Sequence, residues 1–386
     1  MAEAPPPDGV LRGHAAEVMT VRFAAGNSWC QASSPSHPLL LSGDANGEVR
    51  LWSLETRRPL ATLSAHPDKS VLSVQALADG VVLSQGRDGH VRLWDAKDGG
   101  AMRGPLLQVP SQSYNFCQCA CSPSLYAQGR TVCNGSDSQV AGAPTQDAHL
   151  IDGAPLATPD GGTAPSASGP TAAVLAMASE DATFVQLWDP RQKTAVHSLM
   201  PSAAAGRAGM CMCARFAGSD QVLLTGWEDG SLQLFDLRAG AAVASRRVHS
   251  EPLLCLDVDA SASHVITGGA DRTICVLPLQ TSGGDLMAPT GKIELPPSDE
   301  TAGSGGVASL AMRPDGRIFA AGGWDRRVRV WQWRKLKPLA VLQQHTATVH
   351  AVTYSACSRW LASAAGDKTI ALWQLFPPHR SSETTR

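Results

Sequence analysis

The sequence predicts an all-β fold, a seven-bladed β-propeller whose last blade is closed by the N-terminal strand. The first observation is a pattern that recurs seven times: a small or hydroxyl residue, a turn with Asp or Asn, and an alternating strand with a bulky end. The second is the spacing of those ends, which lie 42, 94, 47, 42, 54 and 42 residues apart. An interval near 42 is typical of propeller blades, which have about 40–45 residues. The bulky ends are Trp52, Trp94, Trp188, Phe235, Leu277, Trp331 and Trp373.

The third observation concerns the two ends of the repeat. The seventh repeat finishes at residues 373–375, one strand short of a complete blade. Residues 10–12 precede Gly13 in the same way as residues 60–63 precede His66. Because blades bury their faces only by stacking and a closed ring protects its edges, we expect the N-terminal strand to complete the last blade.

The propeller is expected over residues 10–376, with a short flexible N-terminus over 1–9 and a flexible tail over 377–386. In the first repeat, apolar alternation marks strands at 18–23, 39–42 and 49–52. The third repeat ends at Trp188 and the others cover 13–52, 66–94, 210–235, 249–277, 307–331 and 345–373.

Two insertions interrupt the period. Residues 134–170 contain no aromatic residue, Lys or Arg, so we expect a disordered insertion between the first and second strands of blade three. Residues 280–306 form a long link between blades five and six, with 292–295 as the outer strand of blade five. In the third repeat Asp181 lies seven residues before Trp188 instead of six, which predicts a local bulge.

The recurring pattern resembles WD40 repeats. That resemblance implies tetrads of a loop His, a strand hydroxyl, a turn Asp or Asn and the strand Trp, which satisfy buried polar groups. Blade five lacks the final Trp, and blades four and six lack the histidine. The expected tetrads are His14, Ser42, Asn46 and Trp52; His66, Ser84, Asp88 and Trp94; His345, Ser363, Asp367 and Trp373; and, incomplete, His249, Thr267 and Asp271 with Leu277.

Enzymatic chemistry is not indicated. Ser, His and Asp together could form a catalytic triad, but this grouping recurs in several blades, whereas a catalytic site would occur once. The chain has no GxxxxGK[ST] phosphate loop and no HExxH zinc motif. We therefore expect no catalytic residue, no cofactor, no metal and no small-molecule substrate.

Composition limits the partners and the compartment. The net charge is −2, so no overall field favours nucleic acid, and no run of about 18 apolar residues predicts a membrane span. Residues 1–8 are acidic and proline-rich, unlike a secretory signal. Ten cysteines lack CxxC spacing, and 117, 119 and 121, like 211 and 213, alternate. We expect each set to be buried thiols on one strand face, in a reducing compartment.

Candidate partner-binding residues are large side chains at the turns. Trp and Arg are enriched in binding hot spots, and the tetrads place the histidine loops and Asp turns on one rim. The alternative for Trp227 and for Trp324 is that the side chain packs sideways against a neighbouring blade. The candidates are Arg87, Trp227, Trp324 and Arg326.

A basic cluster lies near the sixth repeat. It could be a solvated blade surface or a site for an acidic protein, with direct nucleic-acid binding less favoured. Its members are Arg326, Arg327, Arg329, Arg334, Lys335 and Lys337.

Four stretches resemble the ASTRA-associated protein 1 family of WD40 proteins: 51–58, 83–88, 321–330 and 337–342. The likeness covers 10–376 apart from the 134–170 insertion. It implies a non-enzymatic scaffold of the ASTRA chromatin-remodelling assembly, in the nucleus and cytoplasm. It further implies partners among the TTT co-chaperone complex, the pontin/reptin ATPases and the phosphatidylinositol 3-kinase-related kinases that they mature.

Two other interpretations use the same fold. Residues 188–191 match, and 235–238 nearly match, the Trp-Asp-x-Arg signature of cullin-type ubiquitin-ligase substrate receptors. A G-protein beta subunit is less favoured, because about ten residues before the first strand are too few for a coiled-coil helix.

Overall fold

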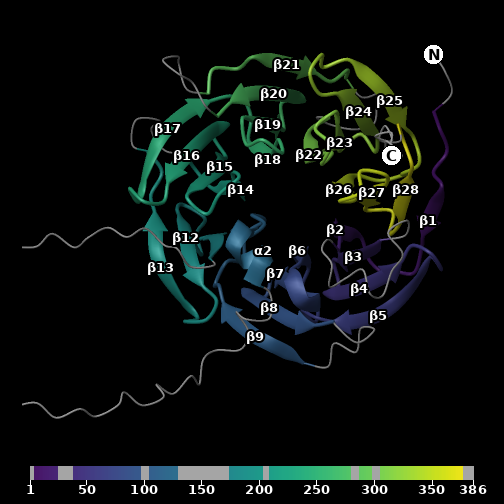
Figure 1. Ribbon diagram of the computed structural model, residues 1–386, viewed down its shortest axis with the longest axis horizontal. Coiled ribbons are helices and arrows are strands. Elements are labelled where there is room, and N and C mark those ends of the chain that lie inside the picture. The colour runs from purple at the N-terminus through teal and green to yellow at the C-terminus, as the bar shows by residue number, and fades with distance from the viewer. Residues whose placement is uncertain are drawn as a thin grey trace, which may run out of the picture.

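The protein forms a closed ring of seven four-stranded antiparallel sheets, which confirms the predicted seven-bladed β-propeller (Figure 1). The computed structural model describes residues 4–24, 38–96, 104–128, 174–202, 208–279, 287–297 and 305–376. The predicted insertion at 134–170 and the tail at 377–386 lie outside these residues.

Each blade runs outward from a strand at the ring centre. The first blade consists of β2 (Val18–Phe23), β3 (Leu39–Asp44), β4 (Glu48–Ser53) and β5 (Arg58–Ser64). The second consists of β6 (Val71–Ala76), β7 (Val81–Gly86), β8 (His90–Asp95) and β9 (Pro105–Pro110), with a 3-10 turn η1 (Ala78–Gly80). The third consists of β10 (Ala120–Cys121), β11 (Leu175–Ala178), β12 (Val185–Asp189) and β13 (Thr194–Leu199).

The remaining blades keep this order. The fourth consists of β14 (Cys211–Phe216), β15 (Val222–Trp227), β16 (Ser231–Asp236) and β17 (Ala241–Arg247). The fifth consists of β18 (Leu253–Val258), β19 (His264–Gly269), β20 (Thr273–Pro278) and β21 (Gly291–Glu294). The sixth consists of β22 (Val307–Met312), β23 (Ile318–Gly323), β24 (Val328–Gln332) and β25 (Pro338–Leu342). The seventh consists of β26 (Val349–Tyr354), β27 (Leu361–Ala365), β28 (Ile370–Trp373) and β1 (Gly9–Leu11).

The N-terminal strand β1 closes the ring, as predicted. It pairs antiparallel with β28, with Gly9 opposite Leu372 and Leu11 opposite Ile370. Figure 1 shows β1 beside β28 on the outside of the last blade. The Asp8 carboxylate also accepts a hydrogen bond from the Gln374 backbone N–H at 2.6 Å. β1 thus gives the last blade the fourth, outer strand that each of the other six blades has.

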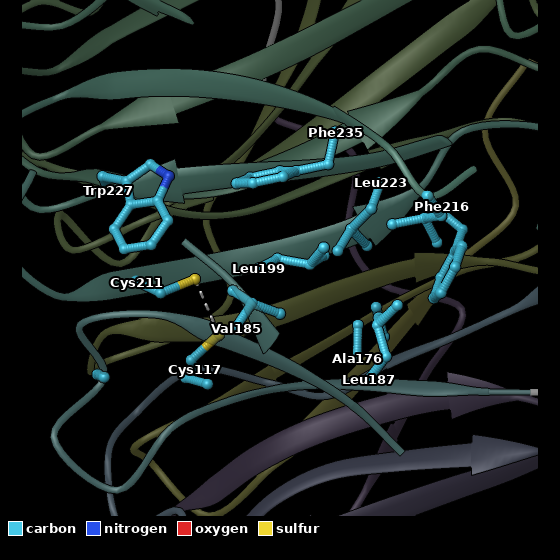
Figure 2. Packing of buried hydrophobic residues seen from close by; sticks show 14 of the residues in the cluster. Cys117, Ala176, Val185, Leu187, Leu199, Cys211, Phe216, Leu223, Trp227 and Phe235 are labelled. Carbon is cyan, nitrogen blue, oxygen red and sulfur yellow. Dashed lines mark hydrogen bonds between the residues drawn. The ribbon is translucent and has the colours of Figure 1, made fainter. Parts of the chain in front are cut away.

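Buried apolar side chains gather in clusters between neighbouring blades. Figure 2 shows one between blades three and four, where Trp227 and Phe235 lie near the thiols of Cys117 and Cys211. Blades therefore stabilise one another through their faces, as the repeat period predicts.

The innermost strands share a bulge near their first residue. In six blades the ladder between the first and second strands shifts register there, so one residue is left without a cross-strand partner. A bulge re-aims the side chain of the extra residue. The six bulged residues are Met19, Leu72, Met212, Leu254, Ala308 and His350.

Blade three departs from the other blades. Its first strand β10 has two residues and continues into a short helix, α2 (Pro123–Gln128). The bulge expected near Asp181 is wrong for the second and third strands, since β11 and β12 pair without a register shift. The turn absorbs the extra residue instead, with Ala182 at φ 59° donating its N–H to the Ser179 carbonyl.

The eight cysteines among the described residues are free and mostly buried, but the expectation that each alternating set lies on one face is wrong. Cys117 joins the cluster between blades three and four, whereas Cys119 and Cys121 join the cluster between blades two and three. Cys211 and Cys213 also separate, because the bulge in β14 lies between them and breaks the alternation.

Candidate protein-binding surface

The histidine loops and Asp turns lie on one face of the ring, here called the upper rim, and blade two shows how they are held. The Trp94 indole donates to Ser84 Oγ at 2.9 Å, and His66 Nε2 lies 2.8 Å from the same hydroxyl. His66 Nδ1 donates to Asp88 at 2.9 Å, and Arg92 donates to the other carboxylate oxygen at 2.5 Å. Every buried proton of this tetrad therefore has an acceptor.

The blade-one tetrad uses Asp44, so the prediction of Asn46 is wrong. His14 Nδ1 lies 2.9 Å from Asp44, and His14 Nε2 lies 2.7 Å from Ser42, which also accepts the Trp52 indole N–H. Asn46 only donates its backbone N–H to Asp44. The reason is position, because the residue eight before the strand Trp points into the blade toward the histidine.

Blades five and seven retain the histidine network without the tryptophan donor. His249 lies 3.0 Å from Asp271 and 2.9 Å from Thr267. In blade seven His345 lies 2.9 Å from Asp367 and 2.6 Å from Ser363.

The inclusion of Trp373 in the blade-seven tetrad is wrong, since its buried indole N–H has no hydrogen-bond partner among the described residues. In blades one and two the outer ladder shifts register just before the tryptophan and re-aims it. β1 pairs with β28 without such a shift and ends at Gly9, opposite Leu372. Trp373 therefore has no outer-strand partner to turn it toward Ser363.

The tetrads are structural, not nucleophilic. Ser84 is fully buried, and its oxygen already accepts the Trp94 N–H. Burial lowers the pKa of the His66, His249 and His345 imidazoles, so these rings are neutral near pH 7. Burial alone would raise the pKa of Asp88, but hydrogen bonds from His66 and Arg92 outweigh it and hold that pKa well below its usual range.

One group of side chains in the described part of the chain has metal-ligand spacing: His14, Asp44 and Glu48. The first two belong to the blade-one tetrad, and Glu48 forms an ion pair with Arg50. The guanidinium supplies the positive charge there, so the contacts account for this group without an ion.

Acidification should destabilise the ring in two stages. The folded pKa values of His66, His249 and His345 lie below the usual 6.5, so the unfolded chain binds more protons and stability falls as the pH drops below 6.5. The tetrad carboxylates add a second loss below pH 3.8. Melting temperatures measured between pH 8 and 3 should show both falls. His249→Gln should reduce the first, and a constant melting temperature from pH 7 to 5 would contradict this account.

Trp227 does not lie on the upper rim, and the prediction that it contacts a partner is wrong. Its side chain is 0% exposed, and its indole N–H donates to Thr225 Oγ1 at 2.8 Å (Figure 2 shows its packing). Like Asp44, it lies eight residues before the strand end. In blades two and five, which have the histidine, this position is glycine, and a Cβ at Gly86 would lie 2.2 Å from His66 Nδ1. Blade four lacks the histidine, and the Trp227 indole takes its place as donor.

Blade six also lacks the histidine, and there Asp325 pairs with Arg329 at 2.6 Å. This ion pair divides the predicted basic cluster. Arg329 is buried, Arg326 lies at the upper turn, and Arg334 and Lys335 lie at the turn after β24, on the opposite rim. The six residues therefore do not form one continuous patch.

Three of the four candidates do lie on the upper rim. Arg87 and Trp324 are each seven residues before a strand Trp, and alternation directs this position away from the tetrad. Arg87 and Arg326 are exposed, and Trp324 is half-buried over Gly306, whose Cβ would lie 2.9 Å from the indole.

The sequence interpretation missed Phe116. It is 63% exposed, and the Arg87 guanidinium lies over its ring, 4.4 Å from the centroid. Tyr114, 50% exposed, packs over Gly89 of the same blade-two turn. The sequence signal that could have identified this site is the pair of aromatic residues, Tyr114 and Phe116, in an otherwise polar linker.

Phe116 and Trp324 both line a cavity of about 630 Å³ at the centre of the ring. The six bulged residues, called the collar from here on, line it too. Five of them are apolar and the sixth is His350. Three residues further along their strands, Arg22, Gln75 and Arg215 line the lower part, and Arg215 pairs with Asp257 at 2.7 Å. The cavity therefore has an apolar upper part and a polar lower part.

Comparison with known proteins agrees with this architecture. Residues 6–53, 57–95, 240–276, 298–332 and 336–374 match the family described as WD domain, G-beta repeat. The chain is 31% identical to the mouse guanine nucleotide-binding protein subunit beta-like protein 1, over 97% of this chain and 98% of that protein. It is 27% identical to ASTRA-associated protein 1 of Verticillium alfalfae, over 97% of this chain and 94% of that protein.

The chain belongs to the ASTRA-associated protein 1 family of WD40-repeat proteins. The Schizosaccharomyces pombe protein of the same name is 24% identical over 96% of this chain and 99% of its own length. The stretch 96–239, which the repeat family does not match, contains blade three and the first three strands of blade four, where the histidine tetrad is replaced.

Two further features of this family member bear on function. In the Trp-Asp-x-Arg segment, the Arg191 guanidinium lies 3.2 Å from buried Asp189, and this pair stabilises the turn after β12. No helix among the described residues is long and apolar enough to cross a membrane.

Proposed function

We propose that this protein is a non-catalytic scaffold of the ASTRA assembly that contacts its main protein partner through the upper rim. It acts with the TTT co-chaperone complex and the pontin/reptin ATPases in maturing phosphatidylinositol 3-kinase-related kinases, in the nucleus and cytoplasm. The names of its relatives, ASTRA-associated protein 1, support its membership of the ASTRA assembly. One observation supports the upper rim as the contact surface. Arg87, Phe116 and Arg326 are exposed, and Trp324 is half-buried, around one cavity.

A rigid ring with exposed aromatic and guanidinium groups is suited to holding other proteins. Neither Arg87 nor Arg326 forms an ion pair within the described residues, so both charges are available to a partner. The buried serines of the tetrads have their hydrogen bonds satisfied, which leaves them no role in covalent chemistry.

The double substitution Trp324→Ala and Arg326→Ala should abolish co-purification of co-chaperone, ATPase and kinase subunits. Both side chains lie outside the inter-blade clusters, so the melting temperature should change by less than about 3 °C. The measurement is quantitative mass spectrometry of a tagged chain at native expression level. The matched control is Arg334→Ala with Lys335→Ala, at the other end of β24.

Equal recovery from both double variants would exclude the upper rim as the contact surface. Recovery of a cullin adaptor in place of the kinase co-chaperones would replace the proposed function with that of a ubiquitin-ligase receptor. Loss of partners from the control alone would move the contact to the opposite rim.

A further inference from the structure

Phe116 is exposed but held in place from both sides. Asn115 donates its side-chain amide to the Ser179 carbonyl at 3.1 Å and accepts the Cys117 N–H at 2.9 Å. Gln85 is fully buried in blade two. Its side-chain amide donates to the Cys117 carbonyl at 3.1 Å and accepts the Cys119 N–H at 2.7 Å. These bonds fasten the loop to two blades. A partner would therefore meet an aromatic ring whose position needs little further ordering.

Among the described residues, Arg87 and Arg326 at the mouth form no ion pair with an acidic side chain. Arg87 stacks on the Phe116 ring, which leaves the guanidinium edges free to bind a carboxylate. Arg326 is exposed on the far side of the cavity, two residues after Trp324. Two acidic groups of the upper rim are already engaged: Glu228 accepts the Met210 N–H at 3.0 Å and Asp88 is held within its tetrad.

The cavity favours a ligand that inserts an apolar group through a positively charged mouth. Its lining contains Arg22, Arg215 and His350 but no Asp or Glu among the described residues. His350 Nε2 is buried and makes no hydrogen bond there, although the Glu17 carboxylate lies 3.4 Å away. The other five collar residues are Met, Leu or Ala. An apolar side chain of a ligand would therefore be in apolar contact on all sides.

We propose that the mouth between Phe116 and Trp324 binds a linear acidic segment of a partner protein, with one bulky apolar side chain inserted into the collar. Carboxylates of the segment on either side of that anchor pair with Arg87 and Arg326. This inference rests on the proposed function and specifies its contact. Exposed Glu17, Glu228 and Glu251 also lie on the rim, so a ligand must place its negative charges at Arg87 and Arg326 and away from these glutamates. A short segment with a few carboxylates meets this condition better than a continuous phosphate backbone does.

The test is a selection of random twelve-residue peptides, displayed on phage, against the immobilised full chain. The expected result is enrichment of peptides with an apolar residue flanked by Asp or Glu. A synthetic copy of an enriched peptide should bind about tenfold or more weakly to Phe116→Ala and to Arg87→Glu. Arg334→Glu on the opposite rim should bind as the unaltered chain does.

A charge exchange separates contact from misfolding. The Arg87→Glu variant should regain binding to a peptide in which one acidic residue is replaced by Lys. Enrichment of basic or purely polar peptides, no enrichment, or binding unaffected by Phe116→Ala and Arg87→Glu would overturn the proposal. So would displacement of the peptide by single-stranded RNA at equal concentration.

These outcomes differ from failure of the proposed function. If co-purification depends on Trp324 and Arg326 while no acidic peptide is selected, the scaffold role stands and the linear acidic contact does not. If acidic peptides are selected but no ASTRA or co-chaperone subunit is recovered, the mouth binds as described and the proposed membership of the ASTRA assembly is wrong.

Discussion

Deleting residues 1–13 should lower the melting temperature of the propeller by about 10 °C or more. The deletion removes β1, its three-residue pairing with β28 and the buried side chain of Leu11, which is 2% exposed. Loss of a buried leucine alone costs about 2–5 kcal/mol. The deletion also leaves β28 as an unpaired edge between blades that depend on closure.

The matched control for this deletion is removal of residues 1–7. That shorter deletion keeps Asp8, whose backbone N–H donates to the Leu372 carbonyl at 2.8 Å and whose carboxylate accepts from Gln374. It should melt as the full chain does in differential scanning calorimetry. If both deletions melted together at the original temperature, the N-terminal strand would have no role in closure.

Substituting Asp88→Ala should cost about 3 kcal/mol, since it removes one partner of a largely buried charged network. Its carboxylate accepts from His66 at 2.9 Å and from Arg92 at 2.5 Å, and the Asp88 and Arg92 side chains are 18% and 14% exposed. Without it, the imidazole N–H has no acceptor and the guanidinium loses its counter-charge. Urea unfolding followed by tryptophan fluorescence should show the midpoint moving to lower urea.

Asp181→Ala is the matched control for the second prediction. Asp181 occupies the corresponding turn in blade three, but it is exposed and accepts hydrogen bonds only from nearby residues such as Ser179 and Thr183. Its removal should hardly change the unfolding midpoint. Equal shifts for the two variants would mean that the histidine network does not stabilise its blade more than an ordinary turn does.

The placing of Trp227 on the rim was an error that alternation alone could have avoided. Side chains in a strand point to opposite faces in turn, so residues eight and seven positions before a strand end must differ in direction. Asp44 and Trp227 are at the first position and point inward, whereas Arg87 and Trp324 are at the second and point outward. Grouping Trp227 with Trp324 ignored this difference.

The upper rim was identified only in part, because its remaining features depend on residues far apart in the chain. Phe116 becomes a binding candidate only when Gln85 of β7 and Ser179, just after β11, hold its loop. The collar consists of residues displaced by bulges, and no single repeat shows where a bulge will form.

The sequence by itself determined the number of blades, their order and the closing strand, since period-two alternation and a repeat near 42 residues are local properties that recur in register. Only the tertiary structure decided what replaces the histidine network in blades four and six, and which distant residues surround the cavity. The Trp227 indole donates to Thr225 in blade four, whereas in blade six, where Ala321 offers no hydroxyl, Asp325 pairs with Arg329. That outcome depends on the space and hydrogen-bonding groups contributed by neighbouring strands and blades, which no single segment contains.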